Sequence, residues 1–466
     1  ATAVAAGAEA TETSPAPPPT STSPPPTATA QPPTRTPTPK PTATPTVDLE
    51  ATAAAETAAR VDRLLARGEE ARAAGDHDQA FELLDEALAL APDETRLYLS
   101  RGLASGMAGD LEQAIADFSR AIELEPENAT AYRGRGVAYN ESGDPDQALA
   151  DFERAIELEP DFAAAYYQRG LAHYDAGDLE PAIADFSRAI ELEPGFAAAY
   201  YNRALAHHEA GNLEQALADF DRAIELEPEE VAAYHNRGMA YYEAGDLEQA
   251  LADFSRAIEL KPDSAMSYNS RGSTYSAAGD SERAMADFDQ AIELDPDHAP
   301  AYFNRALGHE RSGDLAQAIA DYSSAIESDP DFVMAYVNRG AAYDAMGDHE
   351  SAIADFDQTI ALDPERVIAY YNRGVACEHA ADLEQAIANF DKVIELEPDH
   401  ADAYYRRGLA YVQSGDPAQA IANWNRVIAL KPDDAQAYSD RGAAQIEVGD
   451  PEQGMADLDR AIELDP

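Results

Sequence analysis

The feature that most constrains this chain is a proline that recurs every 34 residues without one insertion. The prolines are Pro92, Pro126, Pro160, Pro194, Pro228, Pro262, Pro296, Pro330, Pro364, Pro398, Pro432 and Pro466. A fixed period of this length indicates a stack of similar supersecondary units, each of which buries its apolar face against its neighbours. We therefore predict eleven complete units over residues 93–466 and a weaker unit that ends at Pro92.

Each unit has the pattern of two helices, as residues 163–196 illustrate. The first helix should span about residues 163–176 and end at Gly177 in a left-handed conformation. Asp178 then follows as an N-cap for the second helix. The second helix carries an apolar stripe of helical period and ends before Pro194. The stripe consists of Ala182, Ile183, Phe186, Ala189 and Ile190.

The starts of the second helices support this reading. In most units the capping Asp is followed three residues later by Gln or Glu, as Asp110 is by Gln113, which is a capping-box pattern. Three further prolines directly follow a capping Asp, at the first helical position, where a missing amide does no harm. They are Pro145, Pro417 and Pro451.

The unit resembles the tetratricopeptide repeat. That family has aromatic residues, a Gly, an Ala, a Phe and a Pro at set offsets within 34 residues. One unit of this chain matches those offsets with Tyr132, Gly136, Tyr139, Ala148, Phe152 and Pro160. The resemblance covers about residues 59–466 and implies an all-α fold, a right-handed superhelical α-solenoid of antiparallel helix pairs. It also implies that peptides or partner helices bind the concave face.

The N-terminal part of the chain differs in composition. Residues 15–46 contain 13 of the 30 prolines and ten threonines, so we predict that residues 1–46 form a disordered, extended Thr/Pro-rich linker. Residues 47–92 should contain one long helix over 47–74, which would act as a leading cap, and a degenerate first repeat. In that repeat Leu64 and Leu84 replace the aromatics.

An arginine stands where the family usually has Leu before the first Gly. It recurs in all twelve units, as Arg67, Arg101, Arg135, Arg169, Arg203, Arg237, Arg271, Arg305, Arg339, Arg373, Arg407 and Arg441. Its helical phase points inward, and a buried guanidinium needs a partner. We predict a ladder of contacts with a periodic Asp of the second helix, such as Asp185, with Asn389 and Asn423 as exceptions. The functional alternative is that these arginines bind an anionic ligand.

The opposite face of the first helix should line a concave groove. Aromatic and amide side chains recur there and could hold an extended peptide. The predicted binding residues are Tyr167, Tyr201, Asn202, His235, Asn236, Phe303, Asn304, Asn338, Tyr371, Asn372 and Tyr405. The alternative is that the aromatics pack against the neighbouring repeat. A clamp for a C-terminal carboxylate is disfavoured, because Lys is nearly absent from the repeats.

The charge limits the partners. The formal net charge is −55, of which −52 falls after residue 58. This argues against nucleic acid and against an anionic membrane surface, and it favours protein or peptide partners with basic segments. The alternative is a solvated surface that keeps a long array soluble or adapts it to high salt. No apolar run approaches the length of a membrane span, so we expect no membrane insertion.

The sequence shows no catalytic motif. It lacks a Gly-rich phosphate loop, an HExxH motif and a nucleophile elbow, so we expect no enzymatic activity, no catalytic residues and no cofactor. His173, His207 and His309 take the place of a periodic Tyr, and a core role for them is favoured over metal binding. The single cysteine, Cys377, occupies the same position and should be a buried filler.

We therefore predict a non-enzymatic scaffold that binds a protein or peptide through the concave face. One alternative is an interaction or targeting module of a larger enzyme or transport machine; another is a spacer that associates end to end with its own copies. These alternatives arise because no polar helix follows the last repeat. A Thr/Pro spacer favours an exported or cell-surface location in a bacterium, with the cytoplasm as the alternative.

Overall fold

The computed structural model describes residues 49–465, in which all regular secondary structure is α-helical. The predicted linker 1–46 lies outside the described residues. The helices are α1 Leu49–Ala73, α2 His77–Leu90, α3 Thr95–Met107, α4 Leu111–Leu124, α5 Ala129–Glu141, α6 Pro145–Leu158, α7 Ala163–Asp175, α8 Leu179–Leu192, α9 Ala197–Glu209, α10 Leu213–Leu226, α11 Val231–Glu243, α12 Leu247–Leu260, α13 Ala265–Ala277, α14 Ser281–Leu294, α15 Ala299–Ser312, α16 Leu315–Ser328, α17 Val333–Ala345, α18 His349–Leu362, α19 Val367–His379, α20 Leu383–Leu396, α21 Ala401–Gln413, α22 Pro417–Leu430, α23 Ala435–Glu447 and α24 Pro451–Leu464.

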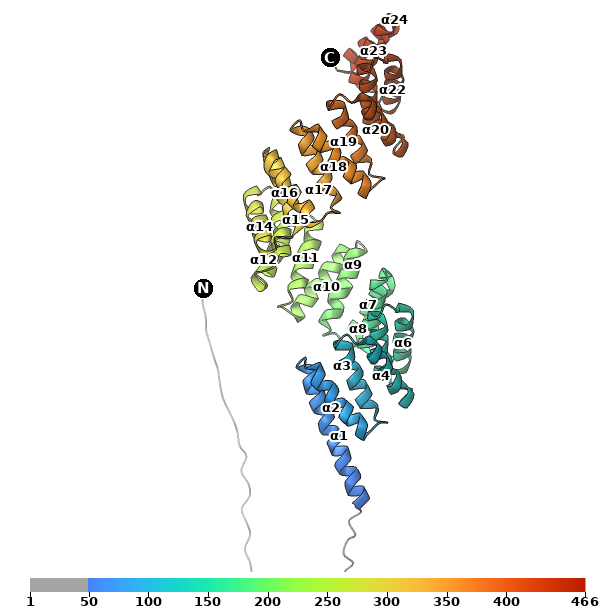
Figure 1. The fold of residues 1–466 in the computed structure, drawn as a ribbon, viewed down its shortest axis with the longest axis vertical. Coiled ribbons are helices and arrows are strands. Elements are labelled where there is room, and N and C mark those ends of the chain that lie inside the picture. The colour runs from blue at the N-terminus through green and yellow to red at the C-terminus, as the bar shows by residue number, and fades with distance from the viewer. Residues whose placement is uncertain (1–48, 466) are drawn as a thin grey trace, which may run out of the picture. The chain divides into compact units, whose positions relative to one another are not determined.

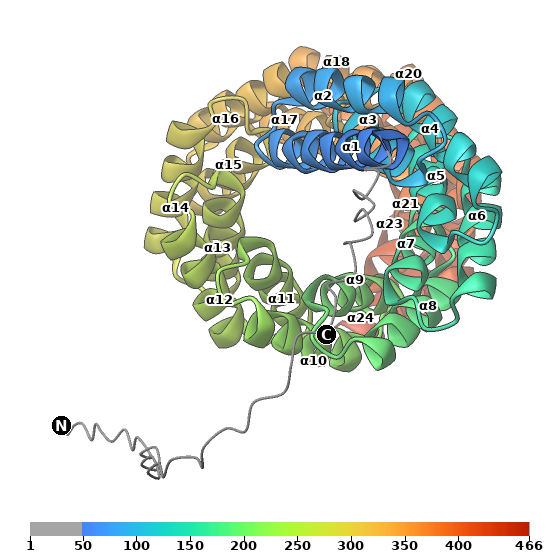
Figure 2. The same ribbon diagram turned by 90° about the horizontal axis from the view of Figure 1, so that it is seen from below.

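The helices follow the 34-residue period and form a right-handed superhelical α-solenoid of antiparallel pairs. The pairs lie in the compact unit Val61–Pro466, except that α1 begins before it. Within that unit the pairs succeed one another in chain order (Figure 1). The labelled even-numbered helices from α2 to α20 lie on the outside of the coil, and the odd-numbered helices from α3 to α17 lie on the inside (Figure 2). We call the surface formed by the odd-numbered helices the inner face.

Small residues let each pair pack closely around one aromatic ring. In α8, Ala182, Phe186 and Ala189 are fully buried. A Cβ atom added at Gly170 of α7 would lie 2.8 Å from Cε1 of Phe186, so the glycine admits the ring. A buried ring, Phe, Tyr322 or Trp424, recurs from α4 to α22, with Ala204 and Ala306 in place of the glycine opposite Phe220 and Tyr322. The last pair has Leu458 at the ring position. The first pair differs, because Leu64 of α1 and Leu84 of α2 form its buried core.

The predicted helix ends are confirmed in most respects. Gly177 has a φ of 79°, and the equivalent glycines are also left-handed. Asp110 caps α4 by accepting from the Gln113 amide. The capping box is incomplete, because the Gln113 side chain donates to Asp117 instead of returning to the cap. Asp178 makes no cap hydrogen bond, since the residue three positions on is Pro181, which has no N–H.

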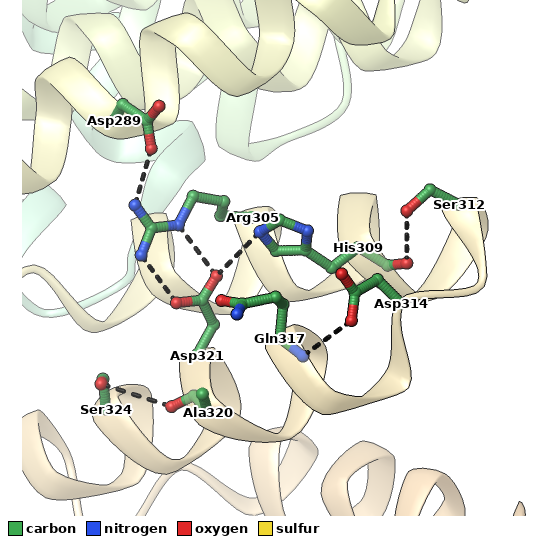
Figure 3. Close-up of polar contacts among 9 residues, drawn as sticks. All are labelled: Asp289, Arg305, His309, Ser312, Asp314, Gln317, Ala320, Asp321 and Ser324. Atoms are coloured by element: carbon green, nitrogen blue, oxygen red, sulfur yellow. Dashed lines mark hydrogen bonds and ion pairs between the residues drawn. The ribbon is translucent and has the colours of Figure 1, made fainter.

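The predicted arginine ladder is confirmed from Arg101 to Arg441. Every arginine of the ladder except Arg169 donates both to its own repeat and to the preceding one, whereas Arg169 donates to Asp185 of its own repeat. Arg305 of α15 donates from Nε and Nη2 to Asp321 of α16 at 2.8 and 2.7 Å, and from Nη1 to Asp289 of α14 at 2.6 Å (Figure 3). Its guanidinium also lies 5.6 Å from the Tyr302 ring centroid. The ladder therefore ties three consecutive helices together.

Two departures from the ladder have simple causes. Arg373 and Arg407 meet Asn389 and Asn423, each of which accepts one hydrogen bond from Nε. Arg67 is exposed, because Leu83 occupies the partner position in the degenerate repeat. Along the rest of the ladder each guanidinium donates from Nε and Nη2 to the aspartate of its own repeat, so the structural interpretation is favoured over an anion-binding one.

Candidate functional site: the inner face

The predicted aromatic residues of the groove lie on the inner face as packed side chains. Tyr167 of α7 contacts Phe186 of its own repeat with ring centroids 5.8 Å apart. It also contacts Phe196, the residue before α9, at 4.7 Å. Tyr201, His235, Phe303 and Tyr371 make the same contact with the core ring of their own repeats, at 5.4 to 6.0 Å. These side chains cover the core aromatic rings from the inner side.

The predicted asparagines connect neighbouring repeats. Asn202 donates from Nδ2 to the Tyr167 hydroxyl at 3.0 Å and to the Ala198 carbonyl at 2.9 Å. Asn236 donates to the Tyr201 hydroxyl at 2.8 Å. Each of the two contacts with a tyrosine hydroxyl joins residues 35 positions apart, one more than the repeat length. The amide groups that we expected to hold a peptide are therefore engaged, in these two repeats, in fastening one inner helix to the next.

The remaining predicted residues follow the same register. Asn304 donates from Nδ2 to Asn269 Oδ1 at 3.0 Å, and the Tyr405 hydroxyl donates to Asp440 at 2.6 Å. Asn338 and Asn372 lie half-buried on α17 and α19. We call this series of contacts the inner-face ladder. It includes six of the eleven predicted residues, Tyr167, Tyr201, Asn202, Asn236, Asn304 and Tyr405. The binding role of all eleven stays a prediction.

None of the inner-face ladder contacts described above involves α5, and a pocket opens there. Arg133 and Gly134 stand at the positions that hold Tyr167 and Gln168, or Tyr201 and Asn202, in the following repeats. The pocket has a volume of about 210 Å³ and lies between α3 and α5 over the ring of Phe118. A Cβ atom at Gly134 would approach Cε1 of Phe118 to 2.6 Å, so the missing side chain helps to form the pocket. Its other lining residues are Gly102, Leu103, Gly106, Met107, Val137, Ala138, Glu141 and Gln168.

Arg133 gives the pocket a cation whose donors are not fully used. Its guanidinium lies 5.6 Å from the centroid of the Phe162 ring. Its buried Nε has no hydrogen-bond partner among residues 49–465. Burial lowers the pKa of the Arg133 guanidinium, although the group stays charged at neutral pH. A mostly apolar pocket with one such donor can accept an apolar side chain and a carbonyl oxygen.

The histidines considered from the sequence lie between the helices. His173 and His207 each have a buried Nδ1 without a partner in the described part of the chain. His309 Nε2 lies 3.7 Å from Asp321 (Figure 3). Cys377 is buried, and burial raises its thiol pKa to about 11, which keeps the thiol protonated and unreactive.

Sequence reasoning missed a different cluster, formed by Asp344, His349 and His379. These residues come from α17, α18 and α19, and one potential ligand atom from each lies within 4.8 Å of the others. The sequence signal that could have found this cluster is the spacing of 35 positions between Asp344 and His379. Its meaning became visible only once the register of the inner helices was known. His349 alone replaces the Leu, Pro or Ser found at its position in the other complete repeats.

The helix pairs, the shared core and the inner face together define a repeat protein of the α-solenoid class. Models of the tetratricopeptide repeat match residues 107–161, 138–195, 167–226 and 269–331, residues 231–264 and 333–366, residues 382–415, and residues 411–466. The chain belongs to the tetratricopeptide repeat family. Proteins of this family are generally non-catalytic scaffolds, and their solenoid commonly mediates protein–protein or peptide interactions.

Several solved structures are similar to parts of the chain. MamA is 28% identical, with 34% of this chain and 93% of MamA covered and a TM-score of 0.33. YrrB, described as a TPR protein with an unusual peptide-binding site, is 24% identical, with 40% and 95% covered and a TM-score of 0.37. A tetratricopeptide repeat protein from Parabacteroides merdae is 22% identical, with 53% and 98% covered and a TM-score of 0.42. No curated protein matches the chain.

No helix in the described range is both long enough and apolar enough to cross a membrane.

Proposed function

We propose that the chain is a non-enzymatic scaffold that binds a protein or peptide on its inner face, with the pocket between α3 and α5 as the anchoring point. The observation that carries this proposal is the pocket over the Phe118 ring, where Gly134 stands in place of the Gln168 or Asn202 of the following repeats. In five later repeats a large ring on the inner face packs against the core ring. Here a mostly apolar pocket lies over the Phe118 ring, beside Arg133, whose buried Nε has no partner in the described part of the chain.

The pocket suits one large apolar side chain of the partner. Its volume of about 210 Å³ is below the range of about 300–1,000 Å³ that is usual for small-molecule sites. An anchor of this kind supplies much of the binding free energy in many interfaces, because it is fully desolvated. Arg133 can donate to a backbone carbonyl next to the anchor, which fixes the register of the bound segment.

The acidic surface selects the segments that flank the anchor. A net charge of −52 after residue 58 attracts lysine and arginine and repels acidic chains. We therefore infer a partner segment with one large apolar residue and basic residues around it. Its association rate should fall as salt increases, because exposed charges are screened over about 10 Å at 0.1 M salt.

The test uses a peptide library in which one Phe, Leu or Met is flanked by Lys or Arg, and a second library with Asp and Glu flanks. We expect the full chain to select peptides from the basic library only. Val137→Asp places a carboxylate in the pocket and should weaken the selected peptides at least about tenfold, which is about 1.4 kcal/mol.

The chain contains a matched control for this variant. Val375 occupies the same repeat position as Val137, but it lies beside Tyr371, which covers the core ring of that repeat. Val375→Asp should cost similar stability and leave peptide affinity unchanged. Equal losses for the two variants would show that the pocket is not the anchoring point, and selection from neither library would contradict the proposal.

Self-association is a second candidate function, favoured by apolar side chains exposed on α24. Met455 and Ile462 are 54% and 64% exposed. If copies associate through this helix, Ile462→Glu should shift the protein to a lower molar mass in light scattering. A wild-type chain that stays monomeric at high concentration would remove this candidate.

The role as a targeting module of a larger machine requires the same inner face, so the library experiment tests it together with the scaffold. For the location, we propose the cell surface on the basis of the Thr/Pro-rich composition of residues 15–46. Labelling of intact cells with an impermeant reagent would test it.

A further inference from the structure

We propose that Asp344, His349 and His379 form a binding site for a divalent transition-metal ion at the junction between two repeats. The three residues come from three consecutive helices. Asp344 lies near the end of α17, His349 is the first residue of α18, and His379 is the last residue of α19. A bound ion would therefore join the repeat formed by α17 and α18 to the repeat that begins with α19.

The side chains already converge on one point. His349 Nδ1 lies 2.6 Å from Asp344 Oδ1, and His379 Nδ1 lies 3.0 Å from Asp344 Oδ2. The two imidazole rings are 5.5 Å apart between centroids, at an interplanar angle of 50°. In a tetrahedral site with bonds of about 2.0–2.1 Å, ligand atoms lie about 3.3 Å apart. An ion could thus replace the hydrogen bonds with small side-chain movements.

The donor set fits zinc and its neighbours in the first transition series. Imidazole nitrogen together with one carboxylate oxygen suits Zn²⁺, Ni²⁺ and Cu²⁺, whereas Mg²⁺ and Ca²⁺ prefer oxygen alone. A neutral imidazole that carries its proton on Nε2 presents Nδ1 as the ligand atom. The side chain of His379 is 44% exposed, so an ion can enter and water can complete the coordination.

The other junctions show why this one is distinct. His208 Nε2 lies 2.9 Å from Glu243 in the same register, with the two residues 35 positions apart. At that junction the position of His349 is taken by Leu213, so two potential ligands are present and the third is missing. Leu also occupies this position in α4, α8, α12, α16 and α20. The repeat can therefore accept His349→Leu without a new packing problem.

The test is a titration of the full chain with Co²⁺, which reports its own coordination through visible absorption. Excess Mg²⁺ is present throughout to occupy the many surface carboxylates. We expect about one equivalent of Co²⁺ to give visible bands that Zn²⁺ abolishes. His349→Leu should weaken this binding at least about 10- to 100-fold, since even the loss of a residue that only supports a ligand has effects of that size.

Two further variants make the result specific. Asp344→Asn keeps the size of the side chain and removes the anionic ligand, so it should also abolish the bands. Its effect does not depend on whether His349→Leu perturbs the fold. His208→Leu removes a histidine from the two-ligand junction and should leave the titration unchanged. The proposal is overturned if the wild type shows no Co²⁺ bands, or if His349→Leu and Asp344→Asn both bind like the wild type.

Discussion

The interior of the helix pairs and the inner face use the same 34-residue period in different ways. In the interior, the arginine ladder is nearly invariant from repeat to repeat, and the two changes from Asp to Asn preserve the contact to Nε. On the inner face, the position of Tyr167 carries Tyr, His, Asn, Phe, Val, Leu, Ser or Arg in the complete repeats. The comparison separates the groups that hold the stack together from those that distinguish one repeat from another.

The same comparison explains where the candidate sites lie. The α3–α5 pocket occurs where Gly134 leaves an inner-face position without a side chain, and the Asp344–His349–His379 cluster occurs where His349 replaces the usual first residue of an even-numbered helix. Neither involves a break in the arginine ladder. Each site is therefore a local variation on a scaffold that the interior maintains, which is how repeat proteins combine a constant fold with a specific surface.

Breaking the arginine ladder should have the largest effect on stability. Arg305→Leu leaves the carboxylate of Asp321, which is 5% exposed, without its cation. We expect a loss of about 3–5 kcal/mol, since an unpaired buried charge is expensive. Urea unfolding, with hydrogen exchange of the amides of α15 and α16 as the local readout, would measure it.

Asp321→Asn is the control for this variant. It recreates the arrangement of Arg373 with Asn389, which the solenoid already contains, so the loss should be only about 1 kcal/mol. Unchanged or higher protection in Arg305→Leu would show that the ladder is not needed for stability.

Much of the fold could be predicted because its determinants are local and periodic. The prolines mark the ends of the even-numbered helices, and glycines such as Gly177 end the odd-numbered ones. The arginine ladder was also predictable, since the inward phase of Arg305 and the recurrent Asp required a partner. Its contact with Asp289 of the preceding repeat was not, because that depends on how two repeats are rotated against each other.

The candidate sites were harder to predict for the same reason. Tyr167 and Asn202 were assigned to the inner face, but their mutual hydrogen bond depends on a register of 35 residues that one helix pair cannot reveal. The pocket arises from absent side chains, Gly134 above all, and a search for functional side chains passes over glycine. His349 and His379 are 30 residues apart and became neighbours only when the repeats stacked.

Ala381, at the end of an odd-numbered helix, allows a test of how much the repeated turn residue itself contributes to stability. It is the only non-glycine residue with positive φ in the described range, at 61°, and it stands where the other complete repeats have Gly. The left-handed region costs an L-residue about 1–2 kcal/mol. Ala381→Gly removes this cost, but the greater freedom of glycine in the unfolded chain offsets part of the gain in stability. We therefore expect Ala381→Gly to stabilise the protein by about 1 kcal/mol.

The measurement is the urea midpoint at a constant slope. Gly347→Ala, at the equivalent position with a φ of 86°, is the reverse change and should destabilise by a similar amount. Effects of the same sign in the two variants would show that backbone strain does not decide stability at this turn.

The smallest predicted effect concerns His235, which is 7% exposed and packs against Phe254. Burial lowers the pKa of His235 below its ordinary value of 6.5. Below that pH the unfolded chain binds a proton at His235 more readily than the folded chain does, so stability is lost as pH falls.

His235→Phe places at this position the residue that Phe303 supplies in another repeat, and it removes the loss of stability caused by protonation of His235. The free-energy difference between variant and wild type should grow in favour of the variant from pH 7 to pH 5, because all other titrating groups are shared. Parallel curves over that range would mean that burial does not oppose protonation of His235, and the inner-face aromatics would then be less tightly packed than the comparison requires.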